Sequence, residues 1–174
     1  MLGLRWGDIS FENKQLSVAQ NLVYANKQYF FKTPKTESGI RTIDLPSSLL
    51  PLLTKHKKQQ LEFKLLFGSD YHDNNLIVCN PNGDPIMPGS FSHKYHRFLE
   101  KNGIRICRLH DLRHTNASLM LQYGVSPKVM SARLGHSNIG ITMDLYTHVI
   151  GNLQEEASNK IEEQLFQKLD VAQE

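Results

Sequence analysis

The chain has 174 residues, a length that predicts one domain, and its 40% hydrophobic and 21% charged residues are typical of a folded globular protein. No apolar run approaches the ~18 residues of a membrane-spanning helix, and the first residues lack the charged-then-apolar pattern of a signal peptide. Two distant cysteines, Cys79 and Cys107, exclude a disulfide framework and a CxxC metal or redox site and favour a reducing cytoplasm.

The charge is unevenly distributed along the chain. The net charge is +3, but residues 152–174 hold six carboxylates and two lysines and so carry −4, which leaves +7 on the preceding residues. A basic body with an acidic tail permits a polyanionic partner such as nucleic acid, although it does not require one.

Residues 8–45 are predicted to form β structure. Leu16, Val18 and Leu22 nearly alternate with polar residues, an aromatic run follows the turn-like residues 25–27, and residues 40–45 form a third candidate strand. A polar connection with a proline and a glycine, residues 33–39, separates the last two strands. We therefore expect a small antiparallel sheet near the N-terminus.

Most of the remaining chain is predicted to be helical, because local start and stop signals bound each segment. The first helix runs from Ser47 to Leu66, with Ser47 or Ser48 as its cap and Gly68 after its end. A short strand at 76–79 and a turn at 80–85 precede helices at about 90–101, 109–123, 127–135 and 138–146, and Ser126-Pro127 is a typical helix start. An apolar residue at every fourth position of 153–169 predicts an amphipathic helix in the tail. The expected fold class is α+β and mainly helical.

The densest polar cluster is His110-Asp111-Leu112-Arg113-His114. On a helix, His110 shares a face with Arg113 and with His114. Three interpretations stay open at this point. The histidines can be a metal-ligand pair, although Asp111 replaces the glutamate of HExxH and no third ligand is marked. The cluster can instead be capping and surface residues, or Arg113 and an imidazole can bind an anion such as phosphate.

A second polar stretch, residues 135–140, lies between two predicted helices. Its GxSxxG spacing does not match the GxSxG of serine hydrolases. By itself, His136 is typical of a turn, and Tyr146 is typical of packing near a helix end. Neither residue indicates chemistry when it is taken alone.

The order of these motifs carries more information than any one of them. HxxR at 110–113, LGHS at 134–137 and TxxxY at 142–146 resemble, in that spacing, the tyrosine recombinase (phage integrase) family. Upstream, LGLRWGDI at 2–9 is similar to the stretch that leads into the family's catalytic sheet, and TPKTxSxxRxI at 33–43 is similar to its lysine-bearing β-hairpin. The likeness extends over residues 1–150 and is greatest to integrases of conjugative transposons and temperate phages of Gram-positive bacteria.

This resemblance implies a reaction and a role for each matching residue. Tyr146 would attack a DNA phosphodiester, leaving a 3′-phosphotyrosyl bond and a free 5′-hydroxyl, with no metal or other cofactor. Arg113 and His136 would stabilise the charge of the transition state, His110 would transfer a proton or orient the tyrosine, and Lys35 would protonate the departing 5′-oxygen. The implied function is site-specific recombination, the integration or excision of a mobile element.

The resemblance also implies a missing part. The family's first catalytic arginine is expected just upstream of Leu2, and Arg5 matches a later arginine that the family does not use for catalysis. We therefore expect a fragment that folds but lacks one phosphate clamp, and the loss of one such donor costs about 10²–10³ in rate.

Residues 1–150 are then expected to form a partial catalytic domain, with its sheet at about 8–45 and its helices at about 47–150. Residues 151–174 would form a helix that packs on a neighbouring subunit or folds back on its own core. The implied partners are double-stranded DNA at recombination sites and other copies of the chain, which form tetramers on DNA in this family, and the expected location is the cytoplasm at the nucleoid, with no membrane association.

Candidate DNA contacts are polar or basic residues beside predicted loops and a helix start, where phosphates are commonly held: Lys32, Thr36, Arg41, Ser92, His93 and Lys94. Two other functions stay open. One is a type IB topoisomerase-like strand-passing enzyme, and the other is a non-enzymatic DNA-binding accessory remnant.

Overall fold

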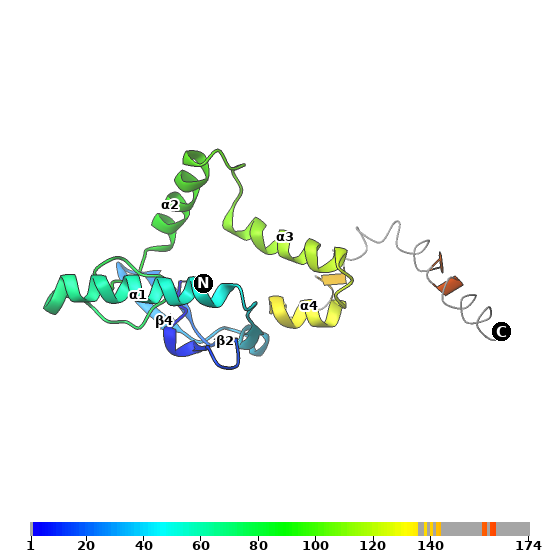
Figure 1. Cartoon of the computed structure of the whole chain (residues 1–174), viewed down its shortest axis with the longest axis horizontal. Helices are drawn as coiled ribbons and strands as arrows, with labels where there is room; N and C mark the ends of the chain where they lie inside the picture. The colour runs from blue at the N-terminus through cyan, green and yellow to red at the C-terminus, as the bar shows by residue number, and fades with distance from the viewer. Residues whose placement is uncertain are drawn as a thin grey trace.

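A computed structural model of the chain describes residues 2–135, 138, 140, 142–143, 158–159 and 161–162. In this part of the chain five strands come first and four α-helices follow (Figure 1). The strands are β1 (Ile9–Ser10), β2 (Gln15–Val18), β3 (Asn21–Ala25), β4 (Gln28–Lys32) and β5 (Arg41–Asp44). The helices are α1 (Leu49–Phe67), α2 (Pro88–Lys101), α3 (Leu109–Gln122) and α4 (Pro127–Leu134).

The strands form two antiparallel sheets where the sequence predicted one. The first has the order β1-β2-β5, with Leu16 opposite both Ile9 and Ile43. The second is the hairpin β3-β4, in which Val23 faces Phe30. The hairpin is separate because its turn residues, Asn26 and Lys27, both have positive φ, the tight-turn geometry that pairs adjacent strands with each other.

The helices begin and end close to the predicted positions. Ser126 caps α4 by accepting a hydrogen bond from the Val129 amide at 3.5 Å, and the helix stops at Gly135 in the left-handed conformation. The start of α1 differs from the expectation: Ser48 occupies the cap position, but its side chain makes no capping hydrogen bond. The Ser47 hydroxyl instead accepts a hydrogen bond from Lys14 at 3.0 Å.

The strand predicted at 76–79 is wrong. Leu76 and Cys79 form two isolated bridges instead, to Arg5 and to Pro85 respectively. The segment divides its pairing because Leu4 and Trp6, near the start of the chain, hydrogen-bond to residues 77 and 75. The segment therefore pairs with two different parts of the chain instead of forming one continuous strand.

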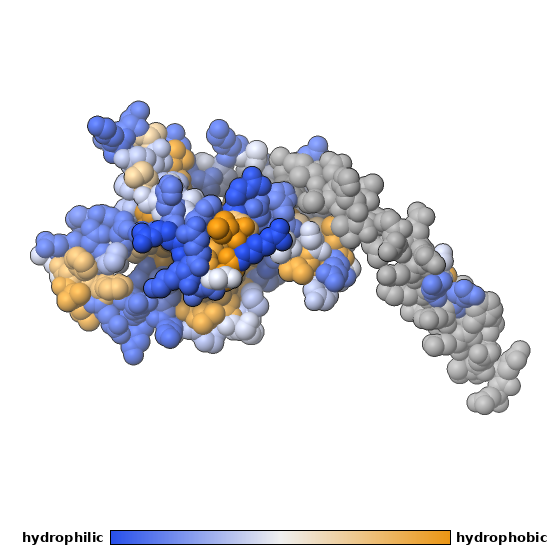
Figure 2. Space-filling view, turned by 90° about the horizontal axis from the view of Figure 1, so that it is seen from above, coloured by the Kyte–Doolittle hydropathy of each residue, from blue (hydrophilic) through white to orange (hydrophobic). Residues whose placement is uncertain are grey.

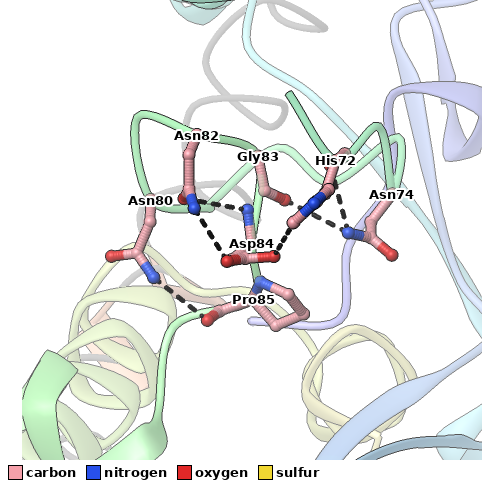
Figure 3. A network of polar contacts seen from close by, with 7 residues as sticks. All are labelled: His72, Asn74, Asn80, Asn82, Gly83, Asp84 and Pro85. Atoms are coloured by element: carbon pink, nitrogen blue, oxygen red, sulfur yellow. Dashed lines mark hydrogen bonds and ion pairs between the residues drawn. The ribbon is translucent and has the colours of Figure 1, made fainter. Parts of the chain in front are cut away.

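The connection between α1 and α2 is held by polar side chains (Figure 3). The Asp84 carboxylate lies at their centre and pairs with His72 Nδ1 and with the Asn82 amide, each at 2.8 Å. The Asn74 side-chain amide donates to the carbonyls of His72 and Gly83, and Asn80 donates to the Pro85 carbonyl. This network fixes the predicted turn at 80–85 against residues 72–74.

The principal apolar cluster joins α3 to α4. Ala117 and Leu121 of α3 pack with Met130 and Leu134 of α4, and Met130 is completely buried. Elsewhere the described surface carries apolar patches among hydrophilic residues (Figure 2). On α1 the most exposed apolar side chains are Leu65 and Leu66. None of the described helices is long and apolar enough to cross a membrane.

Candidate active site

Lys35 lies in a compact loop, residues 33–40, that connects β4 to β5 and is called the Lys35 loop below. The loop closes on itself, because the Gly39 amide donates to the Thr36 carbonyl and the Ile40 amide donates to the Glu37 carbonyl, both at 2.9 Å. Gly39 is required here, since a Cβ at this position would lie 2.5 Å from the Cβ of Pro34. The Lys35 side chain is exposed on this loop.

Arg41, the first residue of β5, connects this loop to α4. Its Nη1 donates to the Gly39 carbonyl at 3.1 Å, and its Nε donates to the Arg133 carbonyl at 3.0 Å. Burial of the guanidinium, followed by the positive charge of Arg113, lowers the pKa of Arg41. The half-buried side chain of Arg41 is therefore held by two backbone carbonyls of the protein.

Gly135, which ends α4, lies against the same guanidinium. Its φ is +69°, and a Cβ there would lie 2.7 Å from Arg41 Nη1 and 2.9 Å from the Ser38 carbonyl oxygen. A cavity of about 360 Å³ opens at this junction, and it is lined by Arg41, Lys128, Ser131 and residues of the loop. The helix end and the Lys35 loop thus meet in direct contact.

His110 and Arg113 lie in the first turn and a half of α3. Asp111 fixes the start of this helix, because its carboxylate accepts from the Arg108 amide at 2.8 Å and pairs with the Arg108 guanidinium. The hydrogen bond from the Arg108 side chain is the main cause that lowers the pKa of Asp111. Asp111 is accordingly a capping residue, as one of the three interpretations predicted.

The two histidines of this cluster are in contact with each other. The rings of His110 and His114 meet edge to face with centroids 4.8 Å apart. His110 is exposed and Arg113 is half-buried. Within the described residues no group of three histidine, cysteine or carboxylate side chains is placed to hold a metal ion.

Of the five predicted reaction residues, the structure describes Lys35, His110 and Arg113. His136 and Tyr146 lie outside the described residues, as do most of the helix predicted at 138–146 and most of the predicted tail helix. His136 directly follows Gly135, so its chain position is next to the contact between α4 and the Lys35 loop.

The residues predicted to contact DNA divide into two groups. Thr36 and Arg41 belong to the Lys35 loop and to β5, and Lys32 ends β4 with its ammonium 5.9 Å from the centre of the Phe30 ring. Ser92, His93 and Lys94 are exposed on α2, which stands apart from α4 (Figure 1). The two groups thus lie on different elements of the described structure.

Sequence reasoning missed the partners of Arg41 and the role of Arg133. Arg133 Nη1 donates to the Asp44 carbonyl at 3.1 Å, so α4 and β5 exchange hydrogen bonds in both directions. The two residues of each pair are 92 and 89 positions apart in the sequence, and no local sequence signal predicts contacts over such distances. Arg5, the residue considered as a substitute clamp, is occupied by the Asp8 carboxylate at 2.8 Å.

The comparisons with known proteins give consistent results. The model of the phage integrase family matches residues 1–152. The chain is 37% identical over 162 residues to the tyrosine recombinase XerC-like protein of Caldanaerobacter subterraneus, which covers 86% of this chain and 41% of that protein. It is 30% identical over 165 residues to the ICEBs1 integrase of Bacillus subtilis, which covers 95% of this chain and 45% of that protein. The chain therefore spans less than half the length of these two relatives.

Solved structures show the same fold. The Tn1549 transposon integrase in complex with a circular intermediate DNA has a TM-score of 0.76 at 22% identity, over 92% of this chain and 52% of that one. The XerA recombinase has a TM-score of 0.64 at 18% identity, over 91% of this chain and 50% of that one. This likeness confirms the predicted α+β, mainly helical fold class.

Proposed function

This chain belongs to the phage integrase family, and from that premise we propose that it cleaves and rejoins DNA as the catalytic part of a tyrosine recombinase. Membership confirms the resemblance seen in the sequence. The observation that carries the proposal is the contact between the Lys35 loop and Gly135, the residue before His136, together with the packing of α4 on α3, the helix that carries Arg113. Lysine, arginine and imidazole groups from three separate elements are a set suited to a phosphodiester.

In the proposed reaction the Tyr146 hydroxyl attacks the phosphorus, and the bond from phosphorus to the 5′-oxygen breaks. Lys35 gives its proton to that departing oxygen, because an alkoxide is a poor leaving group at neutral pH. Arg113 and His136 donate hydrogen bonds to the non-bridging oxygens as their charge grows. The exposed ring of His110 transfers the tyrosine proton or orients the tyrosine. Attack of a new 5′-hydroxyl on the phosphotyrosine reverses these steps and joins different strands.

The substrate, assembly and location follow from the same proposal. In this proposal residues 1–150 are the partial catalytic domain, and 151–174 are a helix that packs on a neighbouring copy of the chain or folds back on its own core. The DNA is double-stranded and carries the recombination sites of a mobile element, and the protein acts on it as an assembly of copies in the cytoplasm, at the nucleoid. Support comes from the Tn1549 transposon integrase, a protein of this fold whose solved structure contains circular intermediate DNA.

A covalent trapping experiment tests the proposal. The DNA is a nicked suicide substrate from the ends of the element that encodes the chain. The protein is used both as the 174-residue chain and fused behind the segment of the ICEBs1 integrase that precedes its matched region. We expect the fusion to form a denaturant-resistant protein–DNA adduct, and its Tyr146→Phe variant to form none. The 174-residue chain alone should form the adduct about 10²–10³-fold more slowly, because it lacks one phosphate clamp. Tyr123→Phe is the matched control, because Tyr123 is 80% exposed at the end of α3.

Two results would contradict parts of this proposal. An adduct that survives Tyr146→Phe excludes that tyrosine as the nucleophile. No adduct from either protein, despite measured DNA binding, favours the non-enzymatic accessory function instead.

A further inference from the structure

We propose that Arg41 is a positioning residue, which ties the loop of Lys35 to the C-terminal end of α4 and so fixes the two segments relative to each other. Its effect on the reaction rests on the proposed function, whereas its effect on structure does not. The sequence suggested Arg41 only as a DNA contact. The described geometry gives its guanidinium two carbonyl partners within the protein.

The first step is the direction of the two hydrogen bonds. Nη1 points to the Gly39 carbonyl on the loop at 3.1 Å, and Nε points to the Arg133 carbonyl in the last turn of α4 at 3.0 Å. A guanidinium is planar and holds its N–H groups at fixed angles, so one side chain fixes the two carbonyls relative to each other. A lysine ammonium has no such fixed fork and cannot hold both in one geometry.

The second step is that α4 has little freedom to slide along β5. Arg41 and Asp44 are the first and last residues of β5, and both are bonded to Arg133, one through its carbonyl and one through its guanidinium. Gly135 then closes against Arg41 and the Ser38 carbonyl with no room for a Cβ. Three contacts thus hold the residue before His136 in one place.

The third step is the link to α3. Helix α4 packs on α3, the helix that carries Arg113, through a shared apolar cluster. Burial, followed by the positive charge of Arg113, lowers the pKa of the half-buried Arg41. Removing Arg41 would therefore loosen the loop and the helix end together.

Amide hydrogen exchange on the 174-residue chain tests the structural part. The amides read are those of Gly39 and Ile40 in the loop and of Gly135 at the helix end, all of which are hydrogen-bonded. In Arg41→Gln we expect exchange to rise by about tenfold or more in both segments, because one lost charge-assisted bond has that effect. Arg41→Lys should restore one segment but not both.

The control is Arg5→Gln, which removes an ion pair with Asp8 outside this junction. In Arg5→Gln, the exchange rates of these three amides should change by no larger a factor than those of the other amides in the chain. An increase in only one segment of Arg41→Gln, or in neither, would overturn the proposal. An equal increase in Arg5→Gln would do the same, because it would show general loosening of the fold.

Adduct formation on two DNA substrates tests the part that concerns Lys35, with the ICEBs1 fusion as the protein. One substrate has the ordinary 5′-bridging oxygen, and the other has sulfur there, which leaves as a thiolate and needs no proton donor. If Arg41 positions Lys35, Arg41→Gln should slow adduct formation on the oxygen substrate at least about tenfold more than on the sulfur substrate. Equal slowing on both substrates would overturn this role.

The two proposals fail in different ways. If the unmodified fusion forms no adduct on either substrate, the proposed function is wrong, and hydrogen exchange alone then decides whether Arg41 joins the two segments. If adducts form but the exchange of the loop and the helix end is independent, the function stands and the positioning role of Arg41 is overturned.

Discussion

Replacing Gly135 by alanine places a methyl group between α4 and the Lys35 loop. Two costs add at this position. The backbone has a φ of +69°, which for a residue with a Cβ costs about 1–2 kcal/mol. The methyl would also lie 2.7 Å from Arg41 Nη1 and 2.9 Å from the Ser38 carbonyl oxygen, both closer than packing allows.

The second cost is the larger, because the neighbours cannot move without breaking contacts. The Ser38 oxygen belongs to the backbone of a closed loop, and Arg41 is held by two carbonyls. Loss of one hydrogen bond from a charged group costs about 1.5–3 kcal/mol. Gly135→Ala should therefore lower the free energy of unfolding by about 2.5–5 kcal/mol in total.

Gly124→Ala is the matched control for this prediction. Gly124 also follows a helix, has a φ of +70°, and has no atom within 4 Å of the position that a Cβ would take. It should cost only the backbone part, about 1–2 kcal/mol. Urea denaturation of both variants measures the difference, and equal losses in the two would refute the contact between Gly135 and the Arg41 guanidinium.

The remaining predictions concern the packing, the charge and the capping of the fold. Met130→Ala should lower the free energy of unfolding, measured by urea denaturation, by about 2–5 kcal/mol, because Met130 is completely buried. The control is Val129→Ala, which should change it by less than about 0.5 kcal/mol because Val129 is exposed. Similar losses in the two variants would contradict the apolar cluster. The hydrogen bond from His72 lowers the pKa of Asp84, so its stabilisation is present above the unfolded-state pKa of about 4 and is lost as pH falls through the folded value. Asp84→Asn should reduce the stability difference between pH 6 and pH 2 by about 0.2–1 kcal/mol, the range of an exposed ion pair. An unchanged difference would exclude this contribution. Ser126→Ala should cost about 0.5–1 kcal/mol, at the low end for a cap because its hydrogen bond is 3.5 Å long, and a gain in stability would contradict the cap.

The sequence predicted helix positions well because their signals are local. Ser126-Pro127 and Gly135 bound α4 as expected, and Gly124 follows α3 in the left-handed conformation. The start of α2 was predicted at Ser90 or Ser92 but lies at Pro88, because proline at the first helical position loses no hydrogen bond. Such differences of a few residues do not alter which side chains share a face.

The errors and omissions concern contacts between distant segments. The predicted strand at 76–79 fails because its partners come from the start of the chain and from Pro85. The bond from Arg41 to the Arg133 carbonyl spans 92 residues, and neither residue has a neighbour in sequence that predicts it. The reaction residues could be proposed from motif order, but the way their elements are held together could not.

Helix α4 has two supports of different chemical kind, and this separates the effects of their loss. Met130 and Leu134 hold it to α3, which carries Arg113, by apolar burial that contributes to the stability of the whole fold. Arg41 and Gly135 hold it to the Lys35 loop through directional contacts, which contribute chiefly to relative position. A change in the apolar support should therefore lower the activity of the protein on every substrate equally, because it reduces the fraction of protein that is folded. A change in the polar support should instead slow the reaction more on a substrate whose leaving group needs a proton than on one whose leaving group does not. Activity on the two substrates therefore distinguishes the two classes of variant.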